Sequence, residues 1–315
     1  MCVRREYTTI AWLREKILRN GASLKLLAFT SSFCRHALDR MKIDRNGGGI
    51  ITLQRMIKPT RAVMVAGWLS EGARSIAPVK TKTVSGARQT RESIQSDFDR
   101  IALLAGERWD HNAHYHGYLM SRIPARCGQI LEIGCGTGTF SRLLAGRAER
   151  VLAIDLSAQM IRLARERSKH YPNIEFVMGD ALTYSLPDEQ FDCIATLTTI
   201  HHLPLETILR RISRALQPGG TFVCLDLYQR SNLSDLLFDG VAYPASLFLG
   251  LIKNGKPRPS REVRAAYAEH GRTDTYLTLP QIRQVCADIL PGALVSRHLF
   301  WRYSIIWKKE LGASA

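Results

Sequence analysis

Residues 130–140 read Ile-Leu-Glu-Ile-Gly-Cys-Gly-Thr-Gly-Thr-Phe, where an apolar segment breaks into three glycines at alternate positions and then enters a helical pattern. Glycine lets the backbone turn sharply and approach a ligand without an intervening Cβ, and the first N–H groups of the following helix are free to meet that ligand. A strand, a glycine turn and a helix in this order predict an α/β fold with a nucleotide-like cofactor at the turn.

The glycine spacing excludes two common cofactor loops. A dinucleotide-binding fingerprint, G-x-G-x-x-G, would need glycine at position 139, where this chain has Thr139. A Walker loop would need Gly-Lys-Ser/Thr after its glycines, and no such sequence follows Gly138. The pattern therefore disfavours NAD, and it disfavours ATP bound through a Walker loop.

Strand and helix patterns alternate along the rest of this region, as a parallel sheet requires. After the strand at 130–133, strands are predicted at 151–154, 174–177, 193–196 and 221–225. Helices are predicted at 91–104, 114–123, 140–147, 158–168, 205–216 and 279–290. The last two apolar segments, 293–300 and 303–308, have the pattern of a terminal antiparallel pair.

Polar motifs follow these strands in a fixed order. Asp155 stands 21 residues after Gly134, Gly179-Asp180-Ala181 follows the third strand, and Ile200-His201-His202-Leu203 follows the fourth. A Gln-Pro-Gly-Gly turn at 217–220 leads into the fifth strand. In this order the motifs resemble those of class I S-adenosylmethionine-dependent methyltransferases, and the resemblance covers residues 125–310.

The resemblance implies a Rossmann-like seven-stranded, mostly parallel sheet with a terminal antiparallel strand and helices on both faces. It also implies S-adenosyl-L-methionine as the cofactor, with Asp155 accepting the ribose hydroxyls and Asp180 the adenine amino group. For Met160 a place against adenine and a place in the core are both open. The cofactor contacts implied in this way are Glu132, Gly134, Cys135, Gly136, Gly138, Asp155, Leu156, Met160, Asp180, Ala181, Leu197, Tyr115 and His116.

Methyl transfer is an in-line displacement, for which positioning supplies most of the acceleration. If the acceptor is a hydroxyl, a group must take its proton, and His201 and His202 follow the fourth strand where the acceptor approaches. The alternative is that this His-His pair shapes the pocket. Cys135 contributes backbone, because no residue that would activate its thiol is visible.

The basic charge is concentrated before the predicted fold. Residues 1–90 hold 17 Lys and Arg against 5 Asp and Glu, whereas the remainder holds 27 against 23. The charge therefore says little about the substrate, and no aromatic and basic pattern favours a nucleic acid. No apolar run is long enough to span a bilayer and no signal peptide is apparent, so we expect a cytoplasmic protein. The seven cysteines show no C-x-x-C pair, which predicts reduced thiols, and no metal-ligand spacing is visible.

We expect two parts, a basic extension over 1–90 with little order and a methyltransferase domain over 91–315. Within the domain, the cofactor core covers 125–225, the C-terminal helix and strand pair cover 279–310, and 226–278 is either a substrate-side lid or an ordinary helical insertion. The expected activity is methyl transfer to a small-molecule acceptor. The alternatives are a lipid or quinone methyltransferase that meets a membrane surface through the extension, and a module that binds S-adenosylmethionine without catalysis. The oligomeric state is left open.

Overall fold

The computed structural model describes residues 90–311 except 105, 107, 232 and 273. The predicted basic extension therefore lies outside the described residues apart from Thr90, and the division at residue 90 stays a prediction. Within the described part, no helix combines the length and the apolar character needed to cross a membrane.

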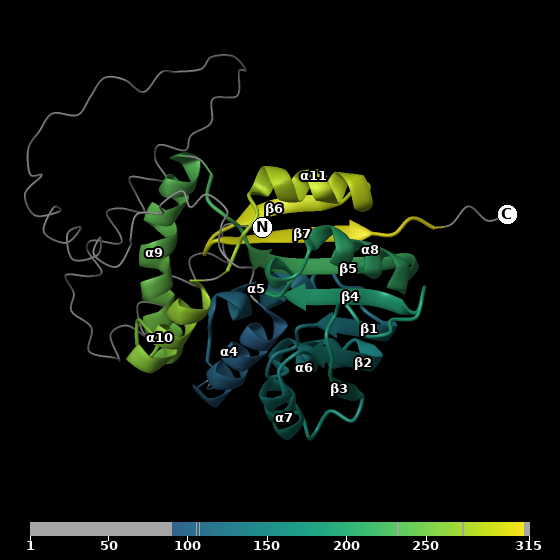
Figure 1. Cartoon of the computed structure of the whole chain (residues 1–315), viewed down its shortest axis with the longest axis horizontal. Helices are drawn as coiled ribbons and strands as arrows, with labels where there is room; N and C mark the ends of the chain where they lie inside the picture. Colours follow the sequence, from purple (N-terminus) through teal and green to yellow (C-terminus); the bar gives the residue numbers. More distant parts are fainter. Residues whose placement is uncertain (1–89, 105, 107, 232, 273, 312–315) are drawn as a thin grey trace, which may run out of the picture. The chain divides into compact units, whose positions relative to one another are not determined.

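Among the described residues, seven strands form one sheet in the order β3-β2-β1-β4-β5-β7-β6 (Figure 1). Strands β1 to β5 run parallel to one another, and β7 runs antiparallel to both of its neighbours. The predicted mostly parallel sheet with a reversed terminal strand is confirmed. The strands are β1 (Cys127–Ile133), β2 (Ala148–Asp155), β3 (Ile174–Met178), β4 (Phe191–Leu197), β5 (Leu216–Leu227), β6 (Leu294–His298) and β7 (Arg302–Lys308).

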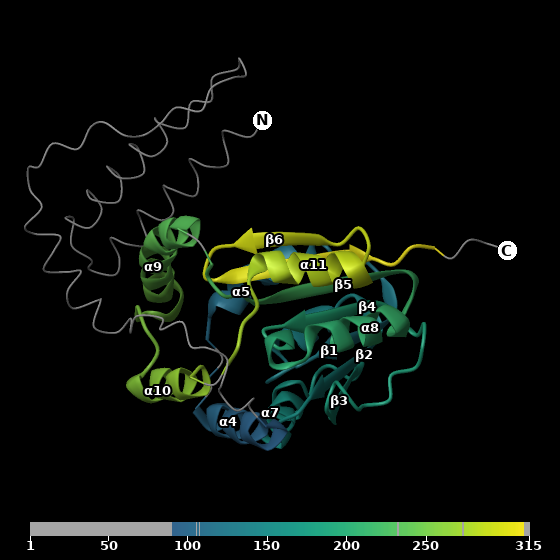
Figure 2. The same ribbon diagram turned by 45° about the horizontal axis from the view of Figure 1, so that its top comes forward.

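Helices cover both faces of the sheet. Buried side chains of α8 and α11 pack on one face (Figure 2), and those of α5, α6 and α7 pack on the other. Helix α4 packs against α7 and α10. The described helices are α4 (Arg91–Leu104), α5 (His111–Met120), α6 (Thr139–Ala145), α7 (Ala158–Arg167), the short 3-10 helix η1 (Ile200–His202), α8 (Leu205–Ala215), α9 (Leu233–Asn254), α10 (Arg261–His270) and α11 (Leu279–Ile289).

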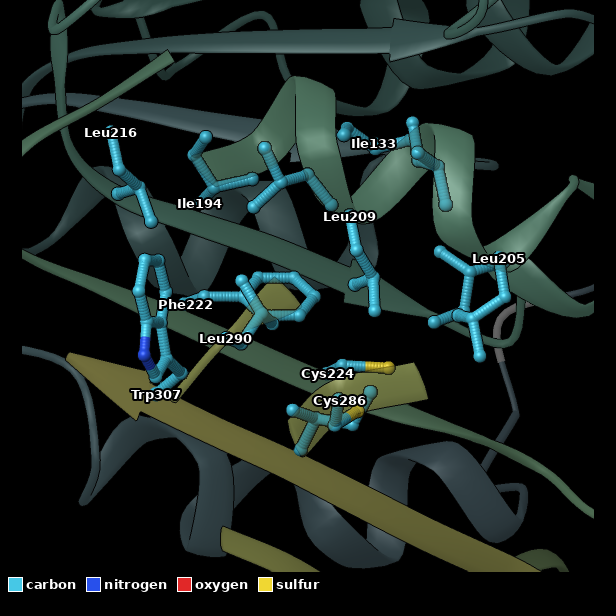
Figure 3. Close-up of a cluster of buried hydrophobic side chains, with 14 of the residues drawn as sticks. Ile133, Ile194, Leu205, Leu209, Leu216, Phe222, Cys224, Cys286, Leu290 and Trp307 are labelled. Carbon is cyan, nitrogen blue, oxygen red and sulfur yellow. The ribbon is translucent and has the colours of Figure 1, made fainter. Parts of the chain in front are cut away.

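Helix α8 shows how the sequence directs this packing. Leu205, Ile208, Leu209 and Ile212 recur at helical spacing and are all buried, so one stripe of the helix faces the sheet. Figure 3 shows part of the cluster that this stripe joins, with Phe222 of β5 beside it. Burial of each such side chain contributes about 1.5–3 kcal/mol to the free energy of unfolding.

Several element boundaries differ from the prediction by a few residues, and for α5 and β5 the reason can be identified. Helix α5 begins at His111 rather than at residue 114, because the Asp110 side chain caps it by accepting the N–H of Ala113 at 2.7 Å. Strand β5 begins at Leu216, which pairs with Phe191 before the glycine turn rather than after it. The turn at 217–220 therefore interrupts the strand as an irregularity instead of preceding it.

The segment 226–278 contributes two helices with different contacts. Ala242 of α9 belongs to the core cluster that α5, α6 and α7 also join, and Ala245 and Leu249 pack against that cluster. Ala266 of α10 is buried in a small separate cluster with Ile101 of α4. The segment thus packs partly on the core and partly on α4.

We expect Leu209→Ala to lower the free energy of unfolding by about 2–5 kcal/mol, because it leaves a cavity in the packed interface between α8 and the sheet. Urea unfolding followed by circular dichroism measures the change. Leu143→Ala on α6 is the matched control, since Leu143 is 40% exposed and its truncation should cost far less. Equal losses for the two variants would contradict the assigned packing.

Candidate functional site

A cavity of about 680 Å³ lies at the carboxyl ends of the parallel strands. Its walls come from the loops after β1, β2, β3 and β4 and from α4, α5 and α10. Open parallel sheets bind ligands at this edge, where the strand order reverses, and β1 beside β4 is that place here. The predicted residues that line the cavity are His116, Glu132, Gly134, Cys135, Gly136, Asp155, Leu156, Met160, Asp180, Ala181, Leu197 and His202.

Three predicted residues lie outside this lining. The Tyr115 hydroxyl donates to the carbonyl of Leu299 at 2.9 Å, so it is used inside the protein. A Cβ at Gly138 would lie 2.9 Å from the ring of Phe176, so this glycine permits close packing of α6 and the sheet rather than facing the cavity. His201 lines a smaller cavity, of about 220 Å³. None of these three residues belongs to the lining of the larger cavity.

The glycine turn after β1 depends on backbone conformations that other residues rarely adopt. Gly134 has φ 73°, and a Cβ there would overlap the side chain of Thr199. Gly136 has φ 53°, and a Cβ there would meet nothing within 4 Å, because this glycine faces open space in the cavity lining. Gly134 therefore lets the loops after β1 and β4 approach each other, and Gly136 leaves space for a ligand.

Asp155 joins the turn to the end of β2. One carboxylate oxygen accepts the N–H of Gly136 at 2.8 Å, and the other accepts the N–H of Ser157 at 2.9 Å. The Ser157 hydroxyl in turn donates to Asp99 of α4 at 2.5 Å. Burial raises the pKa of Asp155, and the backbone hydrogen bonds oppose that rise. Asp99 was not predicted from the sequence, since nothing local connects it to a residue 58 positions away.

Glu132 is a buried acid in the cavity wall, and only 1% of it is exposed. The Ser141 hydroxyl donates to its carboxyl group at 2.5 Å. Burial raises the pKa of Glu132 to about 8, so the carboxyl group is mostly protonated at neutral pH. Burial also raises the pKa of the Cys135 thiol well above its ordinary value, which agrees with a backbone role for this residue.

Asp180 follows β3, and β2 separates that strand from β1, which carries Glu132. The Asp180 carboxylate accepts the N–H of Leu182 at 2.8 Å and forms an ion pair with Arg91 of α4 at 2.9 Å. Arg91 was not predicted, and its side chain is 56% exposed. Met160 both lines the cavity and joins the small cluster with Ile101, so its two proposed places are compatible.

The loop after β4 carries backbone strain at the cavity. Thr198 has φ 50°, a region that β-branched residues rarely adopt. Its N–H donates to the carbonyl of Leu225 at 2.7 Å, and its hydroxyl accepts from Asn112 at 2.9 Å. The Arg302 guanidinium donates to the side-chain oxygen of Asn112 at 3.0 Å. The sequence gives no signal for this chain of contacts, because its members come from four separate segments.

The two predicted histidines have different surroundings. His201 is bound twice by Asp226 at the end of β5, through its backbone N–H at 3.0 Å and through Nδ1 at 2.5 Å. His202 lines the larger cavity, and burial lowers its pKa, so its imidazole is neutral at pH 7. Of the pair, only His202 reaches the larger cavity.

Asp274 lies next to both imidazoles. Its carboxylate is 3.4 Å from Nδ1 of His202 and 4.0 Å from Nε2 of His201. It accepts a hydrogen bond from the Tyr276 hydroxyl at 2.8 Å. The sequence shows no metal-ligand spacing, yet the fold brings His201, His202 and Asp274 together as a group that could hold a metal ion.

A family model described as a methyltransferase domain matches residues 130–220, which hold the glycine turn, Asp155, Asp180 and both histidines. An uncharacterised methyltransferase of Mycobacterium tuberculosis is 28% identical over 201 residues, covering 64% of this chain and 96% of that protein. These matches support a class I S-adenosylmethionine-dependent methyltransferase.

Other relatives of this methyltransferase align over a shorter part. The 2-phytyl-1,4-naphtoquinone methyltransferase of Thermosynechococcus vestitus is 40% identical over 147 residues, covering 42% of this chain and 64% of that enzyme. The demethylmenaquinone methyltransferase of Staphylococcus haemolyticus is 27% identical over 143 residues, covering 44% of this chain and 59% of that enzyme. Among solved structures, the N-methyltransferase NodS of Bradyrhizobium japonicum has a TM-score of 0.48 at 17% identity, covering 69% of this chain and 98% of that one.

The cavity of this methyltransferase fits the cofactor of its family, S-adenosyl-L-methionine. That molecule carries a positive sulfonium and an amino group that is protonated at neutral pH, and the acids Glu132 and Asp155 lie in the wall. Open space at Gly136 lets the backbone approach a ligand closely. Asp180 also lines the cavity, where its carboxylate pairs with Arg91.

We expect alanine in place of Gly134 and alanine in place of Gly136 to have different main effects. Gly134→Ala should lower the melting temperature more, because its Cβ overlaps Thr199, whereas Gly136→Ala should weaken cofactor binding more, because its Cβ enters ligand space. Both carry a conformational cost of about 1–2 kcal/mol for an L residue in the left-handed region. Thermal melts and isothermal titration with S-adenosylmethionine measure the two effects. The same rank order in both measurements would contradict the assignment.

Proposed function

We propose that this methyltransferase methylates a small-molecule acceptor within the larger cavity described above. The observation that carries the proposal is the extent of that cavity, which runs from the glycine turn to α4, α5 and α10 in about 680 Å³. Ligand sites for small molecules have volumes of about 300–1,000 Å³. Because the same space holds the cofactor, the acceptor that shares it is small.

The acceptor end of the cavity is mixed in character. Apolar lining comes from Ile94 and Phe98 of α4 and from Tyr267 of α10, and polar lining comes from Asn112 and Thr198. Apolar walls with a few polar groups orient a ligand without binding a large charge. This lining supports an acceptor with a ring or short chain and one nucleophilic atom.

The side chains act chiefly by positioning. The strained backbone of Thr198, fixed by Asn112 and by the carbonyl of Leu225, holds the loop after β4 in one conformation beside the reacting atoms. S-adenosylmethionine supplies the activated methyl group when bound. For a hydroxyl acceptor, the His201 and His202 region is where a proton leaves, and His202 is the member that lines the cavity.

A prenylated quinone is the second candidate acceptor. The quinone methyltransferases that this chain resembles support it, although the chain spans only 64% and 59% of their lengths. Helix α9 also exposes Val241, Tyr243 and Leu251 close in sequence to exposed Lys253 and Lys256, and a mixed apolar and basic surface suits an anionic membrane. A quinone ring in the cavity, with its prenyl tail along the protein surface, would agree with both the relatives and the exposed surface of α9.

Cofactor binding tests the first step of the proposal. Isothermal titration of the full chain with S-adenosylmethionine should show saturable binding, and Asp155→Ala or Asp180→Ala should weaken it about ten- to a hundredfold, because each removes a charged hydrogen-bond acceptor. Asp188→Ala is the matched control, since Asp188 is exposed outside the cavity lining. Unchanged affinity in both cavity variants would overturn the assignment.

Binding should also release protons. At pH 7 the Glu132 carboxyl group is mostly protonated, since its pKa is raised to about 8, and a cationic ligand beside it favours the ionised form. We expect a release of up to about one proton per bound cofactor, measured by titration in buffers of different ionisation enthalpy. Glu132→Gln should abolish the release. A heat that is independent of the buffer in the unmodified protein would contradict the role of Glu132.

The acceptor class is tested with a cofactor labelled on its transferable methyl group. The full chain is incubated with an aqueous metabolite extract and, separately, with demethylmenaquinone in detergent micelles. Label in water-soluble products supports the first candidate, and label in the quinone supports the second. Cofactor binding without labelled product in either arm would indicate a module that binds S-adenosylmethionine without catalysis.

A further inference from the structure

His201, His202 and Asp274 form a buried polar cluster, and His202 also lines the larger cavity. The two histidines come from η1, and Asp274 comes from the segment between α10 and α11. Their side chains are 6%, 7% and 2% exposed. One potential ligand atom from each residue lies within 4.8 Å of the other two.

The distances inside the cluster leave a gap. Nδ1 of His202 is 3.4 Å from the Asp274 carboxylate, and Nε2 of His201 is 4.0 Å from it. The contact from Nδ1 of His202 to Oδ1 of Asp274 is longer than the about 2.7–2.9 Å of a charge-assisted hydrogen bond. Among the described residues, that oxygen and Nε2, the other nitrogen of the His202 ring, have no hydrogen-bond partner of good geometry. Buried polar atoms in this condition call for an additional partner.

The surroundings orient the cluster as a metal site requires. Asp226 binds Nδ1 of His201 at 2.5 Å, which leaves Nε2 of that ring directed to the gap. The Tyr276 hydroxyl donates to the other oxygen of Asp274 at 2.8 Å. A carboxylate behind a ligating imidazole and a hydrogen bond to a ligating carboxylate are the usual outer partners of a metal ion.

We propose that His201, His202 and Asp274 bind one zinc ion. Tetrahedral zinc with ligand bonds of about 2.0–2.1 Å separates its ligand atoms by about 3.3 Å. The distance from Asp274 to His202 is close to this, at 3.4 Å, and the distance from Asp274 to His201 is longer, at 4.0 Å. Two histidines and a carboxylate, with one position left for an exogenous ligand, form a known zinc ligand set. The smaller cavity of about 220 Å³ adjoins all three residues and provides space for that fourth ligand.

The ion would connect two parts of the acceptor wall. It would join η1 to the segment that follows α10, and Tyr267 of α10 lines the larger cavity. Nitrogens that bind zinc cannot accept a proton, so the ion would exclude the general-base role predicted for the histidine pair. Its open position would face the smaller cavity. The existence of the site does not depend on the proposed acceptor.

The test is a binding measurement on the full chain. After dialysis against a chelator, the protein is titrated with Zn²⁺ in competition with a chromophoric chelator. We expect one tight site that is lost in Asp274→Asn and in His202→Gln and weakened about 10- to 100-fold in Asp226→Asn, which removes an outer partner. His170→Gln is the matched control, because His170 is exposed and outside the cluster. Its zinc affinity should equal that of the unmodified protein.

Co²⁺ provides a second readout that needs no variant. In the unmodified chain it should give the visible absorption of a tetrahedral ion, displaced by one equivalent of Zn²⁺. Circular dichroism checks that each variant is folded, and if one is not, the other variant and the Co²⁺ spectrum decide. Absence of stoichiometric Zn²⁺ binding, an octahedral Co²⁺ spectrum, or full zinc affinity in folded Asp274→Asn and His202→Gln would each overturn the proposal.

Discussion

The hydrogen bond from the Gly136 N–H to the Asp155 carboxylate is the interaction on which the site depends. It fixes the turn after β1 to the end of β2, and the parallel register that pairs Ile133 with Ile154 brings the two loops within reach. Through Ser157, the same carboxylate is connected to Asp99 of α4. Three successive hydrogen bonds therefore connect the glycine turn with α4.

The electrostatics of the cavity follow from burial. Glu132 and Asp155 both have raised pKa values because burial disfavours their charged forms, and each is held by hydrogen bonds that partly offset that cost. Buried acids beside open space stabilise a cation more than exposed ones, since little water competes for the interaction. A positively charged cofactor beside Glu132 therefore favours the ionised form of a carboxyl group that the protein alone keeps mostly protonated.

Local sequence patterns were enough to predict the sheet, but the contacts across it needed the fold. The glycine turn, Asp155 and Asp180 could be located because each follows an apolar strand directly, and parallel strands end at the same edge. Asp226 also follows a strand, β5, but no pattern distinguishes it until Nδ1 of His201 is placed beside it. Asp274 lies in an irregular segment 72 residues from His202, so only tertiary packing shows their proximity.

The segment 226–278 shows why the choice between a lid and an ordinary insertion was not decidable from its apolar character. Apolar residues of α9 pack on the core, whereas α10 supplies Tyr267 to the cavity wall and rests on α4. The contact between α10 and α4 includes the Arg100–Glu269 ion pair, which is largely exposed, and exposed pairs contribute at most about 1 kcal/mol. The buried part of the contact includes Ile101 and Ala266, and His270 of α10 pairs with Asp97 of α4 at 3.1 Å and lies edge-on to the ring of Phe98. Opening of the cavity at α10 would therefore break a buried histidine–aspartate pair and a small apolar contact, whereas displacement of α9 would expose core.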